Sequence, residues 1–138
     1  MLIQVTGLLL MGTKKQIKMK EQFATYEIAL AMKELGLHEP CFGYYRNDNK
    51  FIYLGEDTRV QKNSILAPLW QQCIDWFREK YNLHIGIKTE YDGTFIITIY
   101  NMNKPQRAIQ NFYQYNTYSE AREQVVLKAI ELCKDILK

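Results

Sequence analysis

The chain has 138 residues, of which 47% are hydrophobic and 24% charged, and its formal net charge is +3. This length fits one domain that buries about two-thirds of the surface of its unfolded chain, so folding needs neither a metal nor a disulfide framework. The three cysteines are far apart and odd in number, no paired zinc motif is present, and no apolar run reaches the roughly eighteen residues of a membrane span. We therefore expect a cytoplasmic protein with buried thiols and no metal, cofactor or membrane association.

Residues 1–20 differ in composition from the rest of the chain. They hold four lysines and no acid, so the other 118 residues carry 14 basic and 15 acidic side chains. Two interpretations stay open for this segment: an edge strand from Ile3 to Leu10 followed by a basic linker, or an extension ahead of a native start at Met19. Residues 21–138 form a single, nearly neutral domain in either case, and a neutral body argues against nonspecific nucleic-acid binding.

The first regular element is a helix from Tyr26 to Leu35. Thr25 suits its N-cap, and Gly36 suits the left-handed residue that ends a helix. Beyond Pro40, the β-prone runs 41–46 and 51–54 flank three residues that tolerate turns, which predicts a hairpin. Residues 55–63 read as a charged loop.

The central helix begins at Ser64 or Ala67 and holds both tryptophans. An apolar stripe at the helical period runs along it, formed by Leu66, Trp70, Cys73, Ile74, Phe77 and Tyr81. Asn82 suits the left-handed position after its last turn. A second hairpin follows, with strands at 83–88 and 94–100 around Asp92-Gly93, the strongest turn signal in the chain.

Residues 101–116 read as polar and irregular, and the last helix begins with Thr117 as N-cap and Glu120 in a capping box. The chain is thus an α+β domain of order α-β-β-α-β-β-α, with three helices and an antiparallel sheet of about four strands. The runs 35–38 and 81–84 both read as helix end, left-handed residue, leucine and histidine. This echo allows an internal α-β-β duplication that forms one sheet with approximate two-fold symmetry.

Motifs for enzymatic chemistry are missing from the sequence. There is no phosphate-binding glycine loop, no GxSxG elbow and no HExxH pair. His38 and His84 could act as an acid/base or metal-binding pair only if the duplication brought them together, and the acidic pairs Glu56-Asp57 and Glu90/Asp92 are typical of solvated turns. Cys73 lies on the apolar stripe, where a reactive thiolate is disfavoured. We expect a protein that is not an enzyme.

Aromatic side chains dominate the remaining candidates. Tyr44, Tyr45 and Arg46 follow one another on a strand, so alternation should place some rings on an open face, where Tyr and Arg favour protein interfaces or stacking on bases. The predicted binding residues are Tyr44, Tyr45, Arg46, His84 and Tyr100.

Three stretches, 23–44, 67–83 and 117–121, carry a resemblance to known sequences. They resemble a group of small uncharacterised proteins of phages and mobile elements in Bacteroides-like bacteria, over about residues 21–138. The resemblance implies a small accessory protein of the bacterial cytoplasm and no known activity. We expect an interaction module that binds a host or element protein or forms a homodimer; the alternative is a small-ligand (nucleotide) or nucleic-acid binder that uses an aromatic and basic sheet surface.

Overall fold

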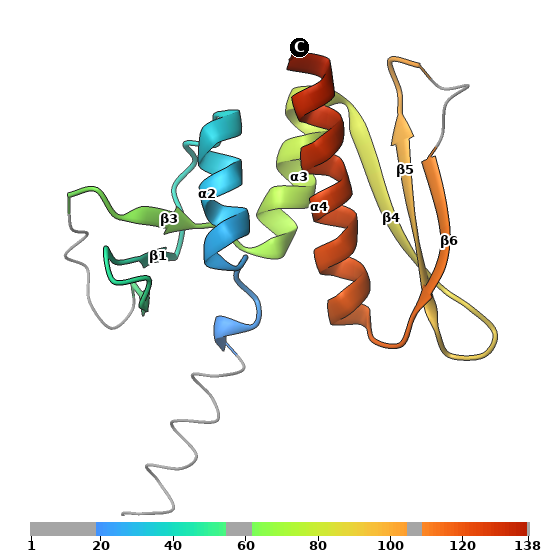
Figure 1. Ribbon diagram of the computed structural model, residues 1–138, viewed down its shortest axis with the longest axis horizontal. Coiled ribbons are helices and arrows are strands. Elements are labelled where there is room, and N and C mark those ends of the chain that lie inside the picture. Colours follow the sequence, from blue (N-terminus) through green and yellow to red (C-terminus); the bar gives the residue numbers. More distant parts are fainter. Residues whose placement is uncertain (1–18, 55–61, 105–108, 138) are drawn as a thin grey trace, which may run out of the picture.

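The computed structural model describes residues 19–54, 62–104 and 109–137. In this part of the chain, three helices lie between two small antiparallel sheets (Figure 1). The helices run in the same direction, so they all begin at one end of the molecule. The two readings of the N-terminal extension, and the pair Glu56-Asp57, fall outside the described residues.

Helix α2 spans Tyr26–Leu35, as predicted. The Thr25 hydroxyl accepts a hydrogen bond from the backbone N–H of Ile28, which satisfies one of the unpaired donors of the first turn. Gly36 has φ 109, a left-handed conformation that glycine adopts without steric strain, and the chain turns there into the buried Leu37.

The first sheet has the order β2-β1-β3, with β1 at Gly43–Tyr45, β2 at Phe51–Tyr53 and β3 at Ile65–Ala67. The predicted hairpin of β1 and β2 is confirmed, with Tyr44 opposite Ile52. The predicted start of the central helix, at Ser64 or Ala67, is wrong, because Leu66 lies in β3 opposite Tyr44. The first residue of the predicted apolar stripe, Leu66, therefore belongs to a strand and not to the helix.

Helix α3 spans Trp70–Tyr81. The Gln72 side-chain oxygen accepts a hydrogen bond of 2.9 Å from the backbone N–H of Leu69, which fixes the first turn. Asn82 follows with φ 54, in the predicted left-handed position. The chain then enters β4 directly.

The second sheet has the order β4-β5-β6, with β4 at Leu83–Thr89, β5 at Phe95–Asn101 and β6 at Ile109–Tyr115. The hairpin around Asp92-Gly93 is confirmed, and its register pairs Leu83 with Asn101 and Thr89 with Phe95. Strand β6 was missed within the stretch read as irregular. Its register with β5 shifts between Phe95 and Ile97, which marks a bulge.

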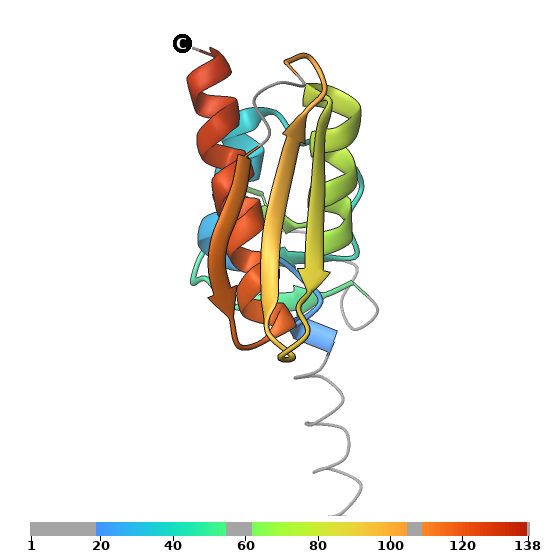
Figure 2. The same cartoon turned by 90° about the vertical axis from the view of Figure 1, so that its right-hand side faces the viewer.

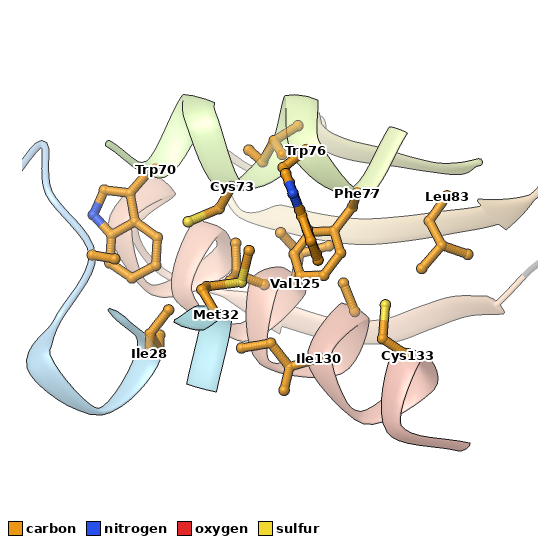
Figure 3. Packing of buried hydrophobic residues seen from close by; sticks show 14 of the residues in the cluster. Ile28, Met32, Trp70, Cys73, Trp76, Phe77, Leu83, Val125, Ile130 and Cys133 are labelled. Carbon is orange, nitrogen blue, oxygen red and sulfur yellow. The ribbon is translucent and has the colours of Figure 1, made fainter. Parts of the chain in front are cut away.

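Helix α4 spans Tyr118–Leu137 and contacts all three strands of the second sheet. The Thr117 hydroxyl accepts a hydrogen bond of 3.1 Å from the backbone N–H of Glu120, so the predicted N-cap is confirmed. Side chains from α2, α3, α4 and β4 meet in the main core, where Met32, Phe77 and Val125 are buried (Figure 3). No helix in the described ranges is long and apolar enough to cross a membrane.

The α+β class and the three predicted helices are confirmed, but the single sheet of about four strands is wrong. The order over the described residues is α-β-β-β-α-β-β-β-α, and the two hairpins belong to different sheets. The internal duplication fails as well. In the first sheet the earliest strand, β1, lies in the centre, whereas in the second sheet the earliest strand, β4, lies at an edge.

Candidate interaction surface

Two of the predicted binding residues lie side by side on the second sheet. His84 of β4 pairs with Tyr100 of β5 in the antiparallel register. Residues directly opposite in such a ladder point to the same face of the sheet. Both residues belong to the binding set predicted from the sequence, and the fold places them next to each other.

The face that they share points away from the helices. Leu83, Ile97 and Ile99 belong to the main core, so their sequence neighbours in the strands point to the other side. We call this side the outer face; within β4 and β5 its residues are His84, Gly86, Lys88, Ile96, Thr98 and Tyr100. In Figure 2 no described helix or strand lies in front of the sheet.

The outer face combines an exposed ring with a half-buried imidazole. Tyr100 is 47% exposed, whereas His84 beside it is half-buried, with its Nε2 3.3 Å from the side-chain oxygen of Asn82. Gly86 lies opposite Thr98, whose hydroxyl donates a hydrogen bond of 3.5 Å to the Gly86 carbonyl. A Cβ atom at Gly86 would lie 2.7 Å from the Thr98 hydroxyl oxygen, so a side chain at this position would require that hydroxyl to move.

Charge is sparse on the outer face. Lys88 is the one formally charged side chain in the set just defined, and its ammonium lies 3.7 Å from a carboxylate oxygen of Glu90. Ile96 is only 6% exposed although it points to this side. The surface of β4 and β5 is therefore close to neutral, with one exposed tyrosine.

Tyr44 and Tyr45 lie in β1 of the first sheet and Arg46 directly follows this strand, so none of the three joins this surface. Tyr44 and Tyr45 are 1% and 4% exposed, so the expectation that this strand exposes an aromatic ring fails at both positions. The Tyr45 hydroxyl donates to the Ala24 carbonyl, and its ring packs edge-on against Tyr26 at 5.7 Å. Arg46 forms a 3.0 Å ion pair with Asp48 inside its own turn.

The candidates for catalysis are also dispersed. His38 lies in the loop before β1 of the first sheet, whereas His84 lies in β4 of the second sheet, so the symmetric arrangement that would have paired them is absent. Asp92 accepts hydrogen bonds from the hydroxyl and backbone N–H of Thr94, which lower the pKa of its carboxyl group. Its role is that of a turn residue.

Cys73 is fully buried, and burial, with a smaller contribution from Cys41, raises the pKa of its thiol to about 12. A thiol with this pKa stays protonated near neutral pH and is a poor nucleophile. Across the described ranges, no cluster of three or more His, Cys, Asp or Glu side chains could hold a metal ion.

Sequence reasoning missed Gly86, Lys88 and Thr98 as part of the surface. Strand alternation from His84 and Tyr100 could have placed them on the same face, because the hairpin register follows from the Asp92-Gly93 turn. Comparison of the chain with protein-family models, with curated proteins and with solved structures finds no match. Functional inference therefore rests on the residues themselves.

Proposed function

We propose that this protein is a non-enzymatic interaction module of a phage or mobile element, which binds another protein through the outer face. The observation that carries the proposal is the open sheet side around the exposed Tyr100 and its cross-strand partner His84. Antiparallel sheets covered by helices on one side bury that side and leave the other to water or a partner. The partner is a host or element protein, or a second copy of the chain.

The chemistry of the surface supports a protein partner. Tyrosine is enriched in the centres of protein interfaces, and charged residues are depleted there. Tyr100 supplies a large ring with few rotatable bonds, and Lys88 is the one formal charge on the outer-face part of β4 and β5. Gly86, opposite Thr98, contributes no side chain to this face.

A second candidate function is the binding of single-stranded nucleic acid on the same face. The exposed Tyr100 ring beside an imidazole is the kind of platform on which bases stack. Such binding also needs a positively charged track for the phosphates. Lys88 alone, already close to Glu90, supplies little of it, so the protein partner is favoured.

Site-specific photo-crosslinking in the cytoplasm of a Bacteroides-like host tests the proposal. A benzoylphenylalanine replaces Tyr100 in one variant and Leu127 in the control; Leu127 is 37% exposed on α4, which covers the opposite side of the sheet. We expect a discrete protein adduct from position 100 that position 127 does not give. A nuclease-sensitive adduct would indicate the nucleic-acid function, and no adduct, or equal adducts from both positions, would contradict binding through this face.

A further inference from the structure

An open cavity of about 410 Å³ lies at the end of the molecule where the three helices begin. Residues near the starts of α2, α3 and α4 line it, among them Thr25, Trp70 and Ser119. Arg122, one turn into α4, also lines it. The cavity is separate from the outer face, and none of the outer-face residues defined above belongs to its lining.

Arg122 is held in one orientation by contacts from two sides. The centre of its guanidinium group lies 5.3 Å from the ring centroid of Trp70 and 5.7 Å from that of Tyr118. One terminal nitrogen, Nη2, donates a hydrogen bond of 3.0 Å to the carbonyl of Glu21. The Trp70 indole N–H donates to the same carbonyl oxygen, also at 3.0 Å. The guanidinium is thus positioned before any ligand arrives.

No carboxylate among the described residues forms an ion pair with Arg122. Glu21 and Glu123 line the same cavity without such a contact. Its Nε is buried without a hydrogen-bond partner, and burial lowers the pKa of the group. A partly buried guanidinium in proteins normally has a carboxylate or phosphate partner, because desolvation of a charge is costly.

We propose that this cavity binds a single carboxylate group carried by a peptide. The two terminal nitrogens of a guanidinium form a planar fork that matches the two oxygens of a carboxylate, and Arg122 uses only one N–H of Nη2 for Glu21. The Trp70 ring supplies an apolar wall for the carbon atoms beside the carboxylate. Lys20, Glu21 and Glu123 also line the cavity, so with Arg122 its formal charges cancel. A neutral lining of this kind offers no positively charged track for a polyanion, which favours a lone carboxylate over a nucleic-acid backbone.

The inference does not rest on the proposed function, since the outer face could fail as an interface while this cavity binds its ligand. Two sources share the chemistry: the C-terminal carboxylate of a peptide and the side chain of an Asp or Glu. Acetyl-alanine carries the first kind of group, and acetyl-aspartic acid α-amide carries the second. Acetyl-alanine amide has no carboxylate and is the matched control ligand.

The test is an NMR titration of the full chain that follows the indole N–H signals. Trp70 and Trp76 are the two tryptophans, and Trp76 is 3% exposed in the core, so its signal serves as an internal reference. We expect a saturable shift of the Trp70 signal in the millimolar range with one or both acids, and none with the amide. The acid that binds more tightly identifies the source of the carboxylate.

Two variants on the same helix complete the test. Arg122→Gln removes the charge and should weaken binding about tenfold or more, whereas Glu123→Gln keeps Arg122 and should bind at least as well as the wild type. The proposal is overturned if the wild-type signal shows no saturable shift, if the amide shifts it equally, or if inorganic phosphate binds more tightly than both acids. Because these three comparisons use the wild-type protein, they stand even if Arg122→Gln fails to fold.

Discussion

His84 and Tyr100 face each other across β4 and β5 at the end of the sheet where α3 leads into β4. Their strands continue to the Asp92-Gly93 turn, so the whole register between them is fixed by one tight hairpin. The pair lies on the side of the sheet that the helices leave uncovered. The fold therefore fixes the positions of both side chains, and neither side chain packs in the main core.

Replacement of Tyr100 by Ala should separate binding from stability. The side chain is 47% exposed, so we expect the free energy of unfolding to change by less than about 1 kcal/mol. If the outer face is the interface, loss of a central tyrosine should weaken partner binding by about 2 kcal/mol, roughly thirtyfold. Urea unfolding and the affinity for the crosslinked partner measure the two effects.

Tyr91→Ala is the control for this substitution. Tyr91 is fully exposed in the β4–β5 turn, at the opposite end of the hairpin from Tyr100. The Tyr91→Ala substitution should leave both the free energy of unfolding and the affinity for the partner unchanged. Equal loss of affinity in the two variants would argue against a site centred on Tyr100.

Gly86 and Thr98 should behave as a coupled pair. Gly86→Ala places a methyl group 2.7 Å from the Thr98 hydroxyl oxygen, and we expect destabilisation of about 1–3 kcal/mol from overpacking. In the Thr98→Ala background the hydroxyl is gone, so the same change should be less damaging. A double-mutant cycle by urea unfolding measures the coupling, and strictly additive effects would contradict the close approach.

The elements that were predictable from the sequence are those with local chemical signals. Gly36 and Asn82 mark helix ends because the chain needs a left-handed residue there, and their φ values are 109 and 54. Thr117 marks a helix start because its hydroxyl accepts a backbone N–H three residues later. The second hairpin follows from its turn residues in the same way.

The elements that were missed depend on distant partners. Strand β3 has only three residues, and Leu66 falls in step with the apolar stripe of α3, so periodicity merged the two. Strand β3 pairs with β1, and in the sequence β2 and residues 54–64 lie between the two. Strand β6 is rich in Asn, Gln and Tyr without clear alternation, and its bulge further obscures the pattern.

The candidate site was predictable only in part for the same reason. Strand alternation places His84 and Tyr100 on one face, but which face is open depends on where the helices pack. Tyr45 was expected near the surface, yet Phe23 and Ala29 close over it in a second, smaller core. Arg122 of α4, Trp70 of α3 and the Glu21 carbonyl before α2 come together only in the folded chain. No local sequence pattern indicates this arrangement.

Phe77→Ala should remove a large share of the folding free energy. The ring is fully buried between α3 and α4 and packs edge-on against Trp76 at 5.6 Å (Figure 3). Truncation of such a ring costs about 3–5 kcal/mol, against a total of roughly 5–15 kcal/mol for a domain. Leu127→Ala, on the exposed side of α4, should change stability by less than about 1 kcal/mol. Urea unfolding followed by tryptophan fluorescence compares the two variants.

Alkaline pH should destabilise the fold through buried groups that resist ionisation. Burial raises the pKa of Tyr45 to about 12, with a smaller contribution from Glu27, and burial raises the pKa of Cys133 to about 12. The unfolded chain releases these protons near the ordinary pKa values of about 10 and 8.5, before the folded chain does. Stability is therefore complete below about pH 8 and falls as the pH rises toward 12. Urea unfolding at a series of pH values measures the decline.

Tyr45→Phe should change this pH profile in a defined way. The variant loses the hydroxyl that donates to the Ala24 carbonyl, so at pH 8 it should be less stable than the wild type by about 1–2 kcal/mol. It also loses the tyrosine proton that the folded state retains, so its stability should fall less steeply between pH 10 and 12. The two curves should therefore converge at high pH, where the wild type has lost its advantage. Parallel curves would show that Tyr45 does not titrate as a buried group.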